Sequence, residues 1–219
     1  MKPTPRKTPT PAKSPAASAR LAKAPHFVRI IGGQWKRTRL AVADKAGLRP
    51  TPDRVRETLF NWLASVAGAG DGELPGWRCV DAFAGTGALG LEAASRGAAS
   101  VLLCEQDPAL VAQLQALKAK LSAEAVRVER GNGVTALERT PAGSLHAVFL
   151  DPPFDNAALY APALAAAARA LRPGGAIYLE AARRWNDDEI AGQGLAVYRH
   201  LKAGAVHAHL LRRVADATA

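Results

Sequence analysis

The sequence of 219 residues contains only two cysteines, Cys79 and Cys104. They show no paired spacing and no neighbouring cluster of cysteine or histidine, which argues against a disulfide framework and against a structural metal site. Each lies inside an apolar run. We therefore expect two small core residues in a reducing cytosol, and no bound metal.

Long apolar runs are absent as well. The positive charges near the N-terminus are followed by Pro, Ala, Thr, Ser and Lys rather than by an apolar segment, which excludes a secretory signal. No window approaches the ~20 apolar residues that a membrane span requires. We expect a soluble, cytoplasmic protein with no membrane partner.

Acidic residues are scarce in the first quarter of the chain. Residues 1–60 carry 14 Lys or Arg against three acids, whereas residues 61–219 carry 15 against 16. A basic segment on a near-neutral body favours a docking arm for a polyanion, because neutralised phosphates release their counterions. Residues 1–26 are too rich in Pro and Lys to bury a core, so we expect a disordered tail there, for which solubility is the alternative role.

Residues 27–67 are predicted to form a basic N-terminal hairpin and a helix. Strand-like segments at 27–31 and 37–42 flank a turn at Gly32-Gly33. A helix with apolar residues at helical spacing follows over 54–63, with Thr51 expected as its N-cap and Pro52 as its first residue. A glycine-rich linker over 68–76 should end it.

Short apolar runs then alternate with helical patterns over residues 77–214. Such alternation predicts an α/β fold, with a mostly parallel sheet, helices on both faces and an antiparallel hairpin at the C-terminus. The expected strands are 78–83, 100–105, 126–129, 147–150, 176–180, 195–201 and 205–213, and the helices are 88–96, 108–121, 134–138 and 159–171.

A glycine-rich turn follows the first of these strands, in the segment DAFAGTGALG over residues 81–90. In a doubly wound sheet this turn lies where ligands bind. Gly85, Gly87 and Gly90 also fit a dinucleotide fingerprint, so the glycines do not separate NAD from S-adenosylmethionine. Asp81 favours the latter, because a carboxylate suits a cationic amino-acid moiety and repels a pyrophosphate.

Polar residues follow the next two strands. Glu105 ends the strand 100–105, where a carboxylate can accept hydrogen bonds from both ribose hydroxyls of a nucleoside. Asn132 lies between Gly131 and Gly133 and is either a contact to the adenine edge or a plain turn residue. Both interpretations of Asn132 stay open.

The buried strand ending at Leu150 runs directly into Asp151-Pro152-Pro153-Phe154. An exocyclic base amine is a poor nucleophile, because its lone pair is delocalised into the ring. Asp151 and the Pro152 carbonyl could each accept one N–H and so localise that lone pair. Phe154 offers a ring on which a base could stack, and a paired base would first have to leave its helix.

Four blocks of sequence carry a family resemblance. They are RIIGGQW (29–35), GLRPTPDRVRETLFNWL (47–63), DAFAGTGALGLEA (81–93) and DPPF (151–154). Together they resemble the bacterial 16S rRNA guanine-N2 methyltransferases of the RsmD type, with likeness over about residues 28–213. The first two blocks are specific to that family, and the last two occur across many amino-methyltransferases.

The resemblance implies a Rossmann-like, seven-stranded S-adenosylmethionine-dependent methyltransferase fold with a small N-terminal hairpin and helix extension. S-adenosyl-L-methionine would be the cofactor, and the residues implied to bind it are Asp81, Phe83, Gly85, Gly87, Glu105 and Asn132. The catalytic residues would be Asp151, Pro152, Pro153 and Phe154. Those implied to line the RNA side are Arg29, Arg37, Arg49, Arg54 and Arg56, for which a solvated helical face is the alternative.

The same resemblance implies the substrate. A monomer would methylate the N2 amine of one guanine, guanine 966, of 16S rRNA in the small ribosomal subunit or its assembly intermediate. An adenine-N6 DNA methyltransferase uses a similar tetrapeptide, but the chain lacks a separate target-recognition domain. A non-catalytic RNA-binding assembly factor is a further alternative, against which the intact Asp151 and glycines argue, and an NAD-dependent oxidoreductase ranks last.

Overall fold

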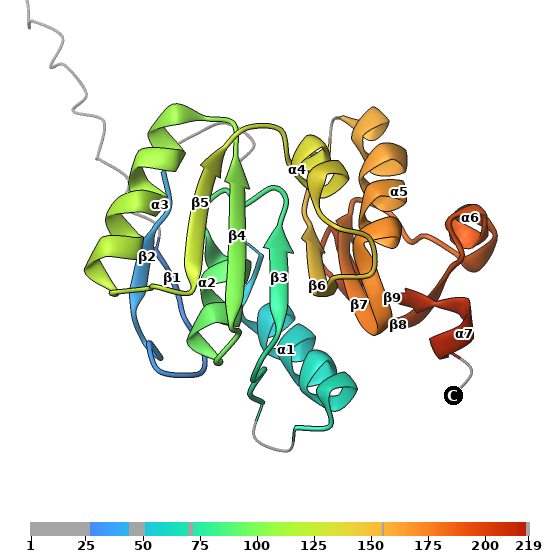
Figure 1. Cartoon of the computed structure of the whole chain (residues 1–219), viewed down its shortest axis with the longest axis horizontal. Helices are drawn as coiled ribbons and strands as arrows, with labels where there is room; N and C mark the ends of the chain where they lie inside the picture. The colour runs from blue at the N-terminus through green and yellow to red at the C-terminus, as the bar shows by residue number, and fades with distance from the viewer. Residues whose placement is uncertain (1–26, 44–50, 70–71, 155, 218–219) are drawn as a thin grey trace, which may run out of the picture.

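A computed structural model describes residues 27–43, 51–69, 72–154 and 156–217 (Figure 1). The predicted tail 1–26 and Arg49 lie outside the described residues. The centre of the molecule is a seven-stranded sheet in the order β5-β4-β3-β6-β7-β9-β8. Its strands are β3 (Arg78–Asp81), β4 (Ser100–Glu105), β5 (Val126–Arg130), β6 (Leu145–Leu150), β7 (Leu171–Ala181), β8 (Leu195–Ala203) and β9 (Val206–Arg213).

The sheet has the predicted topology. The five strands β3 to β7 run parallel, β9 pairs antiparallel with β7, and β8 pairs antiparallel with β9. The strand predicted over 176–180 is longer at its start, with β7 beginning at Leu171 and an irregular register before Ala176. The mostly parallel sheet and its antiparallel C-terminal hairpin are confirmed.

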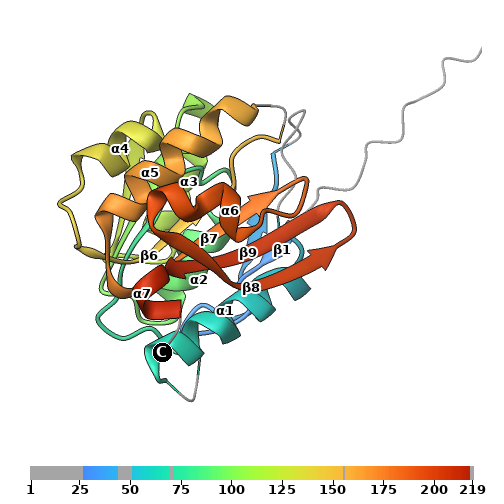
Figure 2. The same cartoon turned by 90° about the vertical axis from the view of Figure 1, so that its right-hand side faces the viewer.

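Helices cover both faces because side chains along each strand alternate between two apolar clusters. Cys79, Phe149 and Tyr178 belong to the cluster under α1 and α2, whereas Val80 and Val148 belong to the one under α4 and α5. Figure 2 shows α1 on one side of the sheet and α4 and α5 on the other. The helices are α1 (Asp53–Ala67), α2 (Ala88–Ser95), α3 (Pro108–Lys120), α4 (Gly133–Arg139), α5 (Tyr160–Ala170), α6 (Asp187–Ile190) and α7 (Val214–Ala217), with 3-10 turns at Ala157–Leu159 and Ala191–Gln193.

Both cysteines are core residues, as predicted. Cys79 on β3 and Cys104 on β4 are buried and unpaired, and burial raises the pKa of each thiol to about 12. Among the described residues, no group of three or more His, Cys, Asp or Glu could hold a metal ion. Within the same part of the chain, no helix combines the length and apolar character needed to cross a bilayer.

The N-terminal hairpin is present, and its turn includes the predicted glycines. The strands β1 (Phe27–Arg29) and β2 (Arg39–Ala41) pair antiparallel, and a connection longer than Gly32-Gly33 joins them. Gly33, with φ of +70°, lies so close to α2 that an added Cβ would be 1.8 Å from the Ser95 carbonyl oxygen. Gly33 begins the turn, because its carbonyl oxygen accepts a 3.2 Å hydrogen bond from the Lys36 amide, and it also allows the loop to approach α2.

The start of α1 also differs from the expectation. Pro52 precedes the first helical residue, Asp53, and no side chain caps the helix. The Thr51 hydroxyl instead donates a hydrogen bond of 2.8 Å to the buried carboxylate of Glu180. The N-cap prediction was therefore wrong. The local sequence does not show that a residue distant along the chain will accept the hydrogen bond of this hydroxyl.

Candidate active site

The residues proposed for cofactor and base lie at one edge of the sheet. Parallel strands end at the same edge, and the central strand β3 lies between β4 and β6. The glycine loop after β3, Glu105 at the end of β4, Asn132 after β5 and Asp151 after β6 therefore converge there. This juxtaposition follows from the strand register and gives the site its outline.

Asp81 is a buried carboxylate at the base of this edge. One of its oxygens accepts a 2.9 Å hydrogen bond from the Gly90 amide, and the other, Oδ1, is buried with no partner among the described residues. Burial is the largest cause that raises the pKa of Asp81 to about 7, the backbone amides of Gly90 and Phe83 counteract part of that shift, and the charge of Glu105 adds to it. An unpaired buried oxygen fits a site that receives a donor or a cation from a ligand.

Glu105 holds the glycine loop in place. Its Oε2 atom accepts from the Gly85 amide at 2.9 Å, and its Oε1 atom accepts from the Gln106 and Asp107 amides at 2.8 and 2.9 Å. Gly87 has φ of +79°, and a Cβ there would be 2.6 Å from Leu114 Cδ2. The carboxylate thus fixes the loop, and its contact with a ribose stays a prediction.

Asn132 has a structural role in the described chain. Its side-chain oxygen caps α4, accepting from the Val134 amide at 2.8 Å and the Thr135 amide at 3.4 Å. A Cβ on Gly133 would be 1.8 Å from the Ala82 carbonyl oxygen, so this turn packs directly on the glycine loop. The capping explains the residue by itself, and the adenine contact stays a prediction, as does the role of the half-buried Phe83.

The tetrapeptide combines a half-buried acid with an exposed ring. No hydrogen bond from a described residue reaches the Asp151 carboxylate or the Pro152 carbonyl. Burial raises the pKa of Asp151 well above its usual value, and the nearby charges of Glu180 and Asp81 add to the shift. Pro152 is buried, Pro153 is exposed, and the Phe154 side chain is 40% exposed. Two acceptors and an apolar ring are thus available together for a ligand.

Glu180 is a further buried acid at this edge of the sheet, and it is not among the residues predicted from the sequence. It is 2% exposed near the end of β7, and its Oε2 atom accepts from the hydroxyls of Thr51 and Tyr178, each at 2.8 Å. Burial raises its pKa, and the two hydroxyls counteract part of that shift. The sequence does contain a signal for Glu180, because it is an acid near the end of a buried strand, as Glu105 is at the end of β4.

Of the five arginines expected on the RNA side, Arg29, Arg37 and Arg54 are exposed. The expectation for Arg56 is wrong, because its side chain is fully buried. Arg56 lies on the buried face of α1 and pairs with Asp53 at 2.6 Å and with Glu92 at 3.6 Å. Its charge is therefore neutralised inside the protein, and Arg49 lies outside the described residues.

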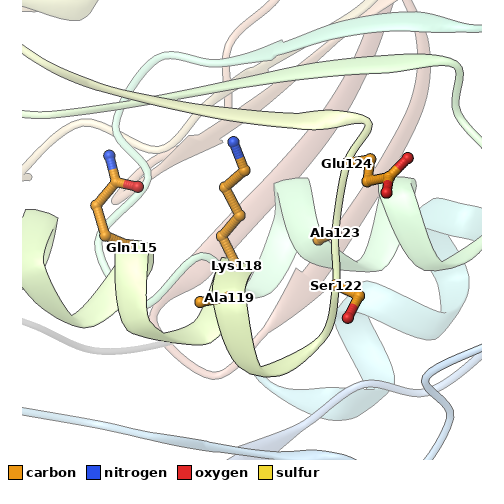
Figure 3. A pocket seen from close by; sticks show the side chains of 6 residues that line it. All are labelled: Gln115, Lys118, Ala119, Ser122, Ala123 and Glu124. Atoms are coloured by element: carbon orange, nitrogen blue, oxygen red, sulfur yellow. The ribbon is translucent and has the colours of Figure 1, made fainter.

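A surface hollow of about 310 Å³ lies away from this edge. The residues lining it, on the last turns of α3 and the loop before β5, are Gln115, Lys118, Ala119, Ser122, Ala123 and Glu124 (Figure 3). The loop before β5 lies at the amino end of the parallel strands, opposite the glycine loop. Its open, mixed lining does not suggest a second active site.

The topology and the solved structures similar to this chain define a class: a Rossmann-like methyltransferase fold. The solved structure of the Escherichia coli protein yhhF is 36% identical and superposes with a TM-score of 0.69, covering 86% of this chain and 98% of that one. The profile of the family described as conserved hypothetical protein 95 matches residues 28–212.

Curated relatives narrow the class to one family. Ribosomal RNA small subunit methyltransferase D of Haemophilus influenzae is 40% identical over 158 residues, covering 70% of this chain and 78% of the relative. The protein of that name from Escherichia coli K12 is 51% identical over 128 residues, and the match covers 58% of this chain and 60% of that relative's length. The chain belongs to the family of ribosomal RNA small subunit methyltransferase D, the RsmD family.

Proposed function

We propose that this chain transfers a methyl group from S-adenosyl-L-methionine to the exocyclic N2 amine of one guanine, guanine 966, in 16S rRNA. The observation that carries the proposal is the juxtaposition of two unpaired acceptors, the Asp151 carboxylate and the Pro152 carbonyl, with the Asp81 and Gly85 edge. The names of the relatives support ribosomal RNA of the small subunit as substrate. The protein would act as a monomer in the cytoplasm, on the subunit or its assembly intermediate.

The chain's residues divide the work. The cofactor, when bound, supplies an electrophilic sulfonium methyl, and its cationic amino-acid moiety suits the unpaired Oδ1 atom of Asp81. Asp151 and the Pro152 carbonyl accept the two N–H groups of the base amine, which turns the nitrogen lone pair toward the methyl. Asp151 would take the proton that the nitrogen loses when the methyl group is transferred to it from the sulfur. Phe154 stacks on the base.

The test is transfer of labelled methyl groups to small ribosomal subunits that lack the modification. Asp151→Ala should reduce transfer at least 100-fold, the loss typical of removing one group that stabilises a transition state. Cofactor binding should stay within a few-fold of wild type. Asp188→Ala, at an exposed position on α6, is the matched control. Full activity of Asp151→Ala would remove this residue from the mechanism.

Mapping the labelled base decides the substrate. Label on guanine N2 of the small-subunit RNA supports the proposal, whereas label on adenine N6 of DNA would favour the rival enzyme. Failure of wild-type protein to transfer a methyl group to any nucleic acid, with cofactor bound, would favour a non-catalytic assembly factor.

A further inference from the structure

We propose that Glu180 is the specificity-determining residue that reads the N1–H of guanine, beside the Asp151 that binds the amine. The inference rests on the proposed function and adds to it a basis for choosing guanine over other amino-purines. It follows from the strand register, from the hydrogen bonds of Glu180 and from the donor pattern of the guanine edge.

The register makes Asp151 and Glu180 neighbours. Leu150 at the end of β6 is opposite Leu179 on the parallel strand β7, so the next positions along the two strands are Asp151 and Glu180. Adjacent strands lie about 4.8 Å apart. Phe149 and Tyr178, two residues earlier on each strand, both lie in the cluster under α1. Alternation then directs Asp151 and Glu180 to that same face of the sheet.

The hydrogen bonds of Glu180 leave one of its oxygens available. Thr51 and Tyr178 both donate to Oε2, at 2.8 Å each. Oε1, in contrast, accepts no hydrogen bond from a described residue. It is also not fully enclosed by protein, so a ligand can reach it. The two hydroxyls thus fix the orientation of the carboxylate and leave one acceptor for a ligand.

Two neighbouring acceptors match guanine. The guanine edge presents the N1–H beside the two N–H groups of the N2 amine, and all three N–H groups are hydrogen-bond donors. With the amine on Asp151 and the Pro152 carbonyl, the base has two orientations, one that directs the N1–H toward Glu180 and one that directs N3, an acceptor, toward it. The carboxylate selects the first. Adenine has an unprotonated N1 at the equivalent position. This nitrogen is an acceptor, and it would face the Glu180 carboxylate, which is also an acceptor, without a hydrogen bond. The pair therefore favours guanine and rejects adenine.

The first probe is 2-aminopurine at the target position, because this base keeps the 2-amino group and lacks the N1–H. It also lacks the O6 carbonyl, so the Glu180 variant assigns the effect to the N1–H. Small subunits would be reconstituted with 16S rRNA carrying either guanine or 2-aminopurine at the mapped site. Wild-type protein should prefer guanine by roughly 10- to 100-fold in kcat/KM, the usual effect of one hydrogen bond to a buried charged group. Equal transfer to both bases by wild-type protein would overturn the proposal without any variant.

Glu180→Gln sharpens the test. The Thr51 and Tyr178 hydroxyls should hold the amide oxygen and turn the amide NH2 toward the base, where it meets a donor in guanine and an acceptor in 2-aminopurine. We expect the guanine preference to fall at least 10-fold, with cofactor binding unchanged. Because the ratio of the two rates is taken within one preparation, partial loss of folded protein cancels. Glu138→Gln, at an exposed position on α4, is the matched control.

The outcomes separate the two proposals. If wild-type protein does not methylate guanine N2 in any subunit, the proposed function itself fails. If wild-type protein methylates guanine and Glu180→Gln keeps the wild-type ratio, only the role of Glu180 fails, and the residue is a structural partner of Thr51 and Tyr178.

Discussion

Glu92 offers the sharpest test of how the N-terminal extension is attached. This glutamate on α2 is 0% exposed. Its two oxygens accept from the backbone amides of Ile31 and Gly32, at 2.7 Å each. It also pairs with Arg96 at 2.9 Å and with the buried Arg56 at 3.6 Å. One carboxylate therefore joins the hairpin, α1 and α2.

Glu92→Gln keeps the shape of the side chain and removes its charge. Whichever position the amide NH2 takes, it faces a backbone N–H, since each carboxylate oxygen accepts from one of them. Two buried guanidinium groups also lose a counter-charge. Breaking a buried ion pair from one side costs about 3–5 kcal/mol, a large share of the roughly 5–15 kcal/mol that stabilises a domain.

Urea unfolding followed by circular dichroism measures this loss. Glu57→Gln, at an exposed position on α1, is the control and should change the free energy of unfolding by less than about 0.5 kcal/mol. Hydrogen exchange at the Ile31 and Gly32 amides would show whether the hairpin detaches before the sheet unfolds. A loss below about 1 kcal/mol, with unchanged exchange at both amides, would refute the role given to Glu92.

Two further predictions concern pH and RNA affinity. The pKa of Asp81 is about 7 in the folded protein against 3.8 normally, so the folded state keeps a proton that the unfolded chain loses. The free energy of unfolding should therefore fall as pH rises from about 4 to 7. In urea titrations of cofactor-free protein, Asp81→Asn should remove roughly 4 kcal/mol of that fall. A difference between the variant and wild type that does not change with pH would contradict this prediction. Arg37→Glu should weaken RNA binding and lower the slope of log affinity against log salt by about 1–2, without a cofactor defect. Lys120→Glu, at the exposed end of α3, is its control, and equal slopes for both variants would exclude Arg37 from the RNA surface.

The sheet and its carboxyl edge could be predicted because their signals are local. Apolar runs of strand length, each followed by a helical pattern, predict parallel strands, and these bring the residues after each strand to one edge. Asp81, Glu105 and Asp151 could be located by this logic, without knowledge of any tertiary contact. The same logic applied to the last residue of the strand 176–180 would have included Glu180.

The errors concern residues whose partners are distant in sequence. Thr51 has the chemistry of an N-cap, but its hydroxyl bonds to Glu180, 129 positions further along the chain. Arg56 has the chemistry of a phosphate ligand, but the helical register that buries Val55 and Leu59 also buries Arg56 against Glu92. In both cases the local sequence predicts one role for the side chain, but a residue distant along the chain binds it instead. The local sequence does not reveal that distant residue.

These tertiary contacts change what the two family-specific sequence blocks mean. In the first block, α2 contacts Ile31, Gly32 and Gly33, and in the second block Arg56 pairs with Glu92. Much of each block therefore attaches the extension to the sheet. Arg29 also takes part in this attachment, because it pairs with Asp53 on α1 at 2.7 Å. Of the five arginines predicted to bind RNA, Arg37 and Arg54 are exposed and remain predictions. Since α2 begins directly after Gly87 of the glycine loop, the hairpin is tied through one short helix to the proposed cofactor site. Under the proposed function, an RNA bound by Arg37 and Arg54 would be held at a fixed distance from Asp151.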